Sequence, residues 1–178
     1  SKVAAALVLL AAGIPMLLQG QELLESRPFG DAQENRIRWS LRTGHSDFFL
    51  FMKDLVRLRR TQPALRSSSS QNVFRVNDGA NVMAFHRWAA AGDDDVVIVS
   101  LSNADFTSYD LGLPLAGEWL EVLNGDAAAY GGSNVGNGGS VMASGPPRDG
   151  LPHSASIVIP KWGVLVLALR PIPAGGPS

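Results

Sequence analysis

The chain has 178 residues, of which 46% are hydrophobic and 17% charged, and its formal net charge is −1. This near-neutral balance gives no electrostatic reason to expect a nucleic acid or an anionic membrane as a partner. The sequence has no cysteine, which excludes disulfides, thiolate metal sites and a cysteine nucleophile, and its three histidines lack metal-ligand spacing. We therefore expect no metal and no cofactor.

The first predicted elements are a helix and a short strand. Residues 2–12 are rich in Ala and Leu and lack turn residues, which predicts a helix buried on most sides. Gly13 fits the position after a helix, and the all-apolar run 14–18 predicts a strand covered on both faces. This apolar stretch is shorter than the roughly 20 residues of a membrane span, and Gly13 and Pro15 interrupt it. No signal peptide is recognisable either, which favours a cytoplasmic protein.

Polar side chains follow this strand directly. Gln19, Gln21 and Glu22 would lie at its carboxyl end, where ligand chemistry collects in α/β architectures. The next residues, 23–44, are irregular and polar, and a loop of this length inside a compact domain is usually functional. The sequence leaves open whether Gln19 and Gln21 bind the polar groups of a ligand or cap the end of a barrel.

Two glutamates in this region, Glu22 and Glu25, are the closest pair in a plausible cleft. A catalytic pair of carboxylates would have to face each other across the bond that reacts, which suits poorly two residues on one loop. A loop-organising Glu22 that binds neighbouring backbone amides is therefore favoured. Trp39 can stack on a flat ligand, although packing in the interior is favoured. Arg36 and Arg38 are expected to pair with Asp31 or Glu34.

The remainder of the chain changes from helix to strand. Residues 48–60 have apolar side chains at helical spacing, and Gln62-Pro63 ends this helix. Four serines, residues 67–70, mark a linker, after which short β-rich runs separated by turns predict an antiparallel sandwich. The expected strands are 82–88, 96–101, 108–113, 118–124, 156–159 and 164–169, with 125–150 as one long loop.

Some polar and aromatic residues of this β region could be functional or structural. The run Asp93–Asp95 is interpreted as a solvated turn rather than a metal loop. His86 is expected to be a hydrogen-bonded structural histidine. Trp88, Trp119 and Trp162 are expected to pack in the core. Asp126 and Tyr130 in the glycine-rich stretch are weak candidates for contact with a ligand.

Residues 13–22, Gly-Ile-Pro-Met-Leu-Leu-Gln-Gly-Gln-Glu, resemble a segment of the α-amylase superfamily, glycoside hydrolase family 13. In that family the seventh helix of the catalytic barrel runs into the eighth strand at this pattern. Residues 37–40, Ile-Arg-Trp-Ser, look like the tryptophan-containing segment that follows, and 58–65 look like the end of the eighth helix. Branching enzymes are the nearest likeness, on Gln-Gly-Gln-Glu and on sandwich segments 84–88, 117–119 and 124–137.

The resemblance implies an α+β fold in two parts. Residues 1–66 would be the last helix-strand-helix unit of a (β/α)8 barrel, and residues 67–178 would form an antiparallel β-sandwich. The parent enzyme would cut α-1,4 links and form α-1,6 branches in α-glucans such as starch, glycogen and amylose. Gln19, Gln21, Glu22 and Trp39 would then bind substrate.

The family's catalytic carboxylates on strands four, five and seven have no counterpart in this sequence. We therefore expect the chain alone to be inactive, with Glu22 and Glu25 as its remaining candidates. An alternative is a non-catalytic glucan-binding or structural sandwich that self-associates through the incomplete barrel segment, because an uncovered apolar strand promotes association.

Overall fold

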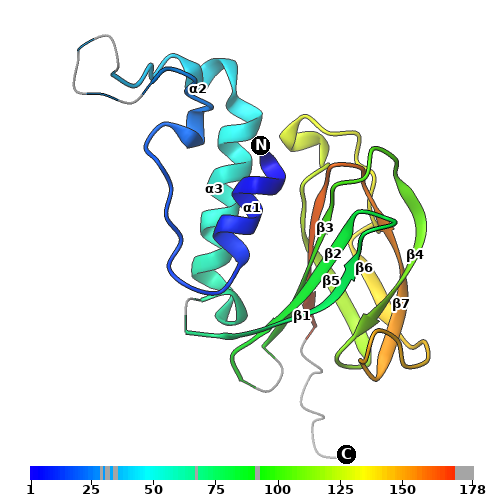
Figure 1. The fold of residues 1–178 in the computed structure, drawn as a ribbon. Helices are drawn as coiled ribbons and strands as arrows, with labels where there is room; N and C mark the ends of the chain where they lie inside the picture. Colours follow the sequence, from blue (N-terminus) through cyan, green and yellow to red (C-terminus); the bar gives the residue numbers. More distant parts are fainter. Residues whose placement is uncertain (29, 31–32, 34–35, 67, 91–92, 171–178) are drawn as a thin grey trace, which may run out of the picture.

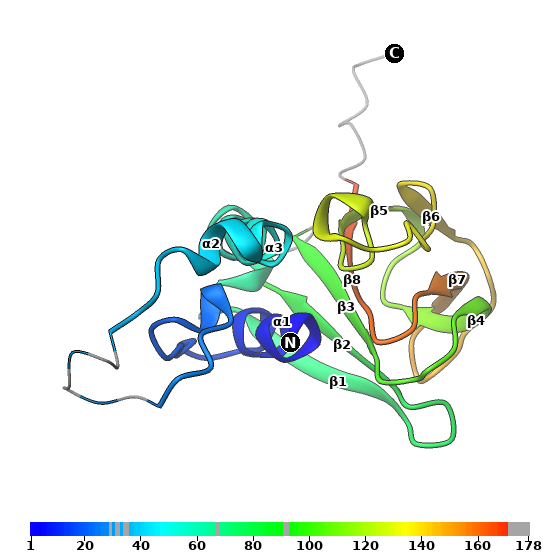
Figure 2. The same cartoon turned by 90° about the horizontal axis from the view of Figure 1, so that it is seen from above.

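The computed structural model describes residues 1–170 except 29, 31–32, 34–35, 67 and 91–92. A helical layer lies against one face of a β-sandwich (Figure 1). Viewed from above, both long helices lie on the same side of the larger sheet (Figure 2). The helices are α1 (Lys2–Leu10), α2 (Leu41–Gly44) and α3 (Ser46–Thr61), with the 3-10 turns η1 (Gln21–Leu23), η3 (Pro63–Leu65) and η4 (Ala128–Tyr130).

The first helix, α1, buries a single stripe of side chains. Ala6, Leu9 and Leu10 are buried, whereas Val8 is 42% exposed. The expectation of a helix buried on most sides is therefore wrong, because α3 and the larger sheet cover only one side of it. The helix ends at Leu10, two residues before the predicted end, and Ala11 is already extended.

The second long helix, α3, confirms the helix predicted at 48–60. Phe48, Phe51, Met52 and Leu55 recur at helical spacing and are all buried, so one face packs inward. The helix stops at Thr61 because a residue before proline is pushed away from helical dihedrals, and Gln62 is extended.

The strand predicted at 14–18 is absent. These residues pair with no described strand, and Ile14, Met16 and Leu18 are 91%, 87% and 54% exposed. An apolar run forms a buried parallel strand only where other strands pair with its edges and helices cover its faces. Within the described residues nothing supplies those neighbours, so the segment lies on the surface.

The β region is an antiparallel sandwich, as predicted. Six strands form one sheet in the order β1-β2-β3-β8-β5-β6, and β4 pairs with β7 in a second sheet. All the pairings are antiparallel. The strands are β1 (Ser70–Asn77), β2 (Val82–Trp88), β3 (Asp94–Ser100), β4 (Phe106–Leu113), β5 (Gly117–Asn124), β6 (Ser140–Ala143), β7 (His153–Ile159) and β8 (Val164–Leu169).

The six predicted strands correspond to β2, β3, β4, β5, β7 and β8. The strands β1 and β6 were not predicted, and the stretch 125–150 is not one loop because it contains η4 and β6. Side chains alternate across β3: Val97 and Val99 pack toward the helices, whereas Val96 and Ile98 pack between the two sheets. The larger sheet is thus buried on both faces and joins two cores.

The run Asp93–Asp95 is not the solvated turn that was expected. Asp94 and Asp95 belong to β3 and are only 9% and 2% exposed. His86 Nε2 lies 2.7 Å from Asp94 Oδ1, which confirms the expected hydrogen-bonded histidine. The ring of Trp88 stacks on His86 at 4.6 Å between centroids. These acidic side chains are buried rather than exposed to solvent because β3 is a central strand of the larger sheet.

Two buried arginines connect α1 to the rest of the molecule. The guanidinium group of Arg59 donates to the carbonyls of Leu9, Ala11 (2.9 Å) and Gly13. Arg87 of β2 donates to the carbonyl of Leu10 and to the linker between α3 and β1. The last carbonyls of a helix have no partner within it. Both arginines therefore satisfy the end of α1 and fix it against α3 and the sheet.

The glycine-rich stretch after β5 fixes the other end of the helical layer. Tyr130 Oη donates to Asp54 Oδ2 of α3 at 2.9 Å, and its ring meets the edge of Phe51 at 5.2 Å. Lys2 Nζ donates to the carbonyl of Gly125 at 3.0 Å. Burial and the Asp54 carboxylate raise the pKa of Tyr130 to about 12, so its hydroxyl stays protonated and donates.

Replacing Tyr130 with phenylalanine removes this hydrogen bond and keeps the ring packing. We expect the free energy of unfolding to fall by about 1.5–3 kcal/mol, the contribution of a hydrogen bond to a charged group. Urea denaturation measures this loss. Tyr109→Phe is the matched control for losing a tyrosine hydroxyl outside the helical layer, since Tyr109 Oη accepts from Arg75 and Asn77. A loss below about 0.3 kcal/mol for Tyr130→Phe would show that the contact contributes nothing.

Candidate functional site

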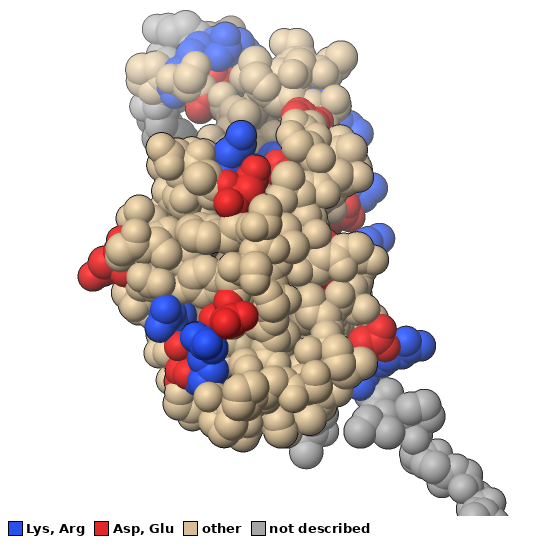
Figure 3. Space-filling model, turned by 90° about the vertical axis from the view of Figure 1, so that its right-hand side faces the viewer, with Lys and Arg blue, Asp and Glu red and all other residues tan. Residues whose placement is uncertain are grey.

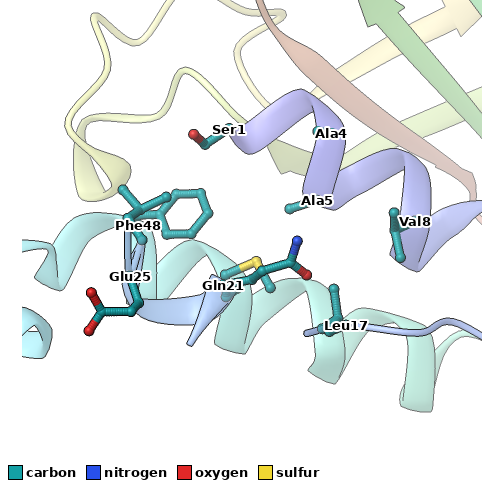
Figure 4. Close-up of a pocket in the computed structure, with 10 residues that line it drawn as sticks. Ser1, Ala4, Ala5, Val8, Leu17, Gln21, Glu25 and Phe48 are labelled. Atoms are coloured by element: carbon teal, nitrogen blue, oxygen red, sulfur yellow. The ribbon is translucent and has the colours of Figure 1, made fainter. Parts of the chain in front are cut away.

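An open groove of about 460 Å³ lies between α1, the segment 17–25 and α3. Figure 4 shows its walls: small side chains from α1 on one side, Phe48 from α3 on another, and Gln21 beneath. Ala4, Ala5 and Val8 face the groove from α1 at helical spacing. This lining is mainly apolar, and Gln21 contributes a polar side chain to it.

The predicted residues Gln19, Gln21 and Glu22 lie together at the turn that follows the surface segment 14–18. Gln21 Oε1 accepts from the backbone N–H of Leu18 at 2.9 Å, and Glu22 Oε2 accepts from that of Gly20 at 2.9 Å. Glu22 thus organises the loop, as the favoured interpretation predicts. The side chain of Gln19 is exposed and lines a second, smaller cavity beside Gln21.

Glycine is required at position 20 because φ is +91°, a left-handed value that other residues adopt with strain. A Cβ there would also lie 3.0 Å from Glu25 Cβ. The turn therefore brings the polar residues on both sides of Gly20 close to Glu25.

Glu25 is bound within the loop and turned away from the groove (Figure 4). Its carboxylate accepts from the backbone N–H groups of Ser26, Arg27 and Arg38, each at 3.0 Å. Arg38 Nη2 also lies 2.6 Å from Glu25 Oε1. The Arg38 side chain, followed by these backbone donors, holds the pKa of Glu25 far below its usual range. A carboxylate that stays ionised at neutral pH cannot act as a general acid.

Arg38 has a partner that was not expected. Arg36 and Arg38 were expected to pair with Asp31 or Glu34, which lie outside the described residues, whereas Arg38 pairs with Glu25. Arg38 therefore joins the two ends of the loop, a role that sequence reasoning missed. The two residues are 13 positions apart, and no spacing rule for a loop connects them.

The tryptophans divide between interior and surface. Trp119 is fully buried between the sheets, as predicted, and Trp88 is partly buried. Trp39 and Trp162 are 68% and 59% exposed, so the expectation that they pack in the interior is wrong for both. Trp39 precedes α2 with its ring open to solvent, which leaves a face free for stacking on a ligand.

Asp126 and Tyr130, the weak candidates in the glycine-rich stretch, have structural contacts. Asp126 Oδ2 accepts from the backbone N–H groups of Ser133 and Val135 at 3.1 and 3.0 Å. Tyr130 binds Asp54 as described above. These contacts shape the loop and leave little of either polar group for a ligand.

Charge is sparse on the face of the sandwich that carries β4 and β7, where Figure 3 shows scattered charged groups separated by broad uncharged surface. Arg148 and Asp110 form one of its opposite-charge pairs at 3.2 Å. Among the described residues, no three His, Asp or Glu side chains gather in a way that could hold a metal ion. None of the helices in the described part is long and apolar enough to cross a membrane.

Comparison with known proteins identifies the domain. Residues 75–170 match the family described as the alpha amylase C-terminal all-beta domain, and they include most of the sandwich. The chain belongs to this family. Its curated relatives include 1,4-alpha-glucan branching enzymes GlgB. That of Paraburkholderia xenovorans is 34% identical over 130 residues (70% of this chain, 18% of the relative), and that of Leifsonia xyli is 36% identical over 162 residues (87% and 22%).

Solved structures share the fold. A debranching enzyme from Nostoc punctiforme superposes with a TM-score of 0.62 at 15% identity, covering 94% of this chain and 30% of that one. This coverage extends beyond the sandwich into the helical layer. This chain spans about a fifth of the length of the curated relatives that it matches.

Proposed function

We propose that this chain is the C-terminal part of an α-glucan-active enzyme of glycoside hydrolase family 13, of the branching type. The observation that carries the proposal is the 36% identity to a 1,4-alpha-glucan branching enzyme over 87% of the chain. That similarity includes the helical layer as well as the sandwich. The parent enzyme would cut α-1,4 links and rejoin the released chain as an α-1,6 branch.

In this proposal residues 1–66 complete a catalytic barrel. The exposed apolar segment 14–18 supports this role, because contiguous exposed apolar surface marks an interaction site in an otherwise well-packed protein. Paired with further strands, the segment would become the buried strand that its composition favours. The catalytic carboxylates would lie on those further strands, and both Glu22 and Glu25 would organise the loop beside them.

The polar turn would form part of the glucan cleft. Gln19 and Gln21 would offer amide groups to sugar hydroxyls, and Trp39 would stack on a pyranose ring. Glu22 would hold the turn through its bond to the Gly20 amide. The ion pair between Glu25 and Arg38 supports this assignment, because contacts that hold a binding loop in place before ligand binds reduce the entropy lost on binding.

Complementation tests the proposal. The experiment uses the branching enzyme of Leifsonia xyli, truncated before the region that matches this chain. It is co-expressed with the 178-residue chain, and the two together are assayed on amylose. Loss of iodine colour without new reducing ends, which is the signature of branching, is expected only with both pieces present. The chain assayed alone is expected to change neither signal. Activity of the chain alone would contradict the proposal that its catalytic acids lie elsewhere.

The double substitution Ile14→Asp and Met16→Asp separates the surface segment from the fold of the chain. Because both side chains are almost fully exposed, we expect the stability of the chain alone to change by less than about 0.5 kcal/mol. In the complemented enzyme the same aspartates would be buried in the barrel, and activity should be lost. Full activity of the reconstituted variant would show that segment 14–18 stays at the surface.

The alternative is a non-catalytic module that self-associates, and the exposed segment 14–18 is the observation that favours it. Sedimentation equilibrium distinguishes the two proposals. A dimer that dissociates in the Ile14→Asp, Met16→Asp variant, together with failed complementation, would establish the alternative.

A further inference from the structure

The turn between β7 and β8 places a tryptophan where neither the backbone nor burial favours one. Trp162 has a φ of +46°, a left-handed value that is unfavourable for a bulky residue and that turns ordinarily assign to Gly or Asn. Its side chain is 59% exposed, so core packing does not compensate for the strain. Strain that brings no folding gain points to a functional role.

The turn is held firmly. The backbone N–H of Trp162 donates to the Ser102 carbonyl at 3.0 Å, and that of Lys161 donates to Asp105 Oδ1 at 2.8 Å. On the other side of the turn, Ser100 N–H donates to the Gly163 carbonyl at 2.9 Å. These bonds fix the backbone that carries the indole, so the ring is presented from a preorganised platform.

A groove of about 590 Å³ opens beside this ring, between α1 and the sandwich. Figure 1 shows the turn from β7 to β8 at the same end of the molecule as the start of α1. Val3, Leu7 and Leu101 give the groove apolar walls, and Leu101 is 51% exposed. This groove is separate from the one beside Gln21. The two share Ser1 and Ala4, but this one is lined by Val3 and Leu7 of α1 and the other by Ala5 and Val8.

The charge of the groove restricts its ligand. Lys2 is the charged residue among those that line it, and its ammonium group is already bound to the Gly125 carbonyl. The lining therefore offers a single lysine, whereas phosphates, nucleic acids and acidic peptides are attracted by clusters of positive charge. A flat, exposed indole beside an apolar wall suits a neutral ring with one apolar face and a hydroxyl rim, which describes a pyranose.

We propose that Trp162 is the stacking platform of a second glucan-binding site, on the sandwich side of α1 and distinct from the cleft at Trp39. The identity of the ligand as an α-glucan rests on the proposed function. The site would bind a sugar ring of a chain whose reacting end lies elsewhere. It would hold the polymer without contributing to the chemistry.

The test uses the variant Trp162→Gly in the 178-residue chain. Glycine relieves the positive φ, so the variant is expected to be at least as stable as the parent chain, and loss of binding cannot then be attributed to unfolding. Maltoheptaose is titrated while the indole N–H signals are followed by NMR, and the signal missing from the variant identifies Trp162. We expect that signal to shift, and the affinity of the variant to fall by about tenfold, a typical effect of removing an aromatic anchor.

Two controls keep this test separate from the proposed function. Trp39→Ala should leave the response of Trp162 unchanged, and a response of Trp39 alone would overturn the second site while leaving the proposed cleft intact. Cellohexaose, a β-linked glucan of similar size, should bind more weakly, and an equal response would overturn the assignment to α-glucans. An unshifted Trp162 signal at millimolar maltoheptaose, or unchanged affinity in Trp162→Gly, would overturn the site itself.

Discussion

Replacing Arg87 with alanine is expected to lower the free energy of unfolding by about 3–5 kcal/mol, the usual cost of breaking a buried charged network. The Arg87 side chain is fully buried. Its guanidinium group donates to the carbonyls of Leu10, Arg66 (2.7 Å) and Ser70 (3.2 Å) and to Ser69 Oγ. One side chain thus satisfies the end of α1, the α3–β1 linker and the start of β1.

The expected loss has two physical sources. Alanine would leave several buried carbonyls without donors, and each unsatisfied group costs about 1–3 kcal/mol unless water reaches it. It would also remove the positive charge that stabilises the ionised form of the buried Asp95 on the neighbouring strand. Both losses fall at the junction of helices and sandwich, so we expect α1 to detach first.

Urea denaturation measures the total effect, and hydrogen exchange of the α1 amides reports the local one. Arg57→Ala is the matched control, because Arg57 is exposed and its pairing with Asp54 spans 3.6 Å. It should cost less than about 0.5 kcal/mol. A loss for Arg87→Ala no larger than that of the control would mean that water replaces the guanidinium group without penalty.

The sequence predicted the strands whose burial selects a recognisable pattern of apolar residues. It missed β1 and β6, whose residues show no such pattern. β3 and β8 contain apolar runs of Val, Ile and Leu, and β2 begins with the apolar run 82–85. Both faces of these strands are largely buried. β1 is an edge strand with mostly exposed side chains, so no alternation of apolar and polar residues marks it. The four residues of β6 are too short to show any period.

The errors at segment 14–18 and at the Asp93–Asp95 run come from the same limit. The type of a residue determines the environment that it favours, whereas its burial depends on which other elements pack against it. Segment 14–18 is apolar but receives no neighbouring strand within the described residues. Asp94 and Asp95 are acidic but lie on a central strand that packing covers. Neither outcome is encoded in the local residues.

The candidate site was predictable in part. Gln19, Gln21 and Glu22 are adjacent in sequence, so a single turn brings them together and local reasoning suffices. The Glu25–Arg38 pair closes a loop of 13 positions, and the two buried arginines connect elements 46–77 residues apart. Such contacts depend on the tertiary fold. The exposure of Trp162 was missed because its positive φ appears only in the structure.

The stability of the chain is expected to fall as the pH rises from 5 to 8, because of Asp95. Burial, followed by the nearby Asp94 carboxylate, raises the pKa of Asp95 to about 7, while Arg87 opposes the shift and Asp93 adds to it. One of its carboxylate oxygens, Oδ2, has no hydrogen-bond partner among the described residues. In the unfolded chain the pKa returns to about 3.9. Between these values the folded state binds more protons, so its stability is greatest at the acidic end and declines toward pH 7.

The magnitude follows from linkage at about 1.4 kcal/mol per pH unit, which gives a free energy of unfolding roughly 2–3 kcal/mol lower at pH 8 than at pH 5. Urea titrations at the two pH values measure this difference. Asp95→Asn removes the titration and should flatten the profile. Asp110→Asn, at an exposed carboxylate paired with Arg148, should leave the decline in place. A decline that persists in Asp95→Asn would assign it to other groups, and the buried Asp95 would then be ionised already at pH 5, held in that state by the charge of Arg87.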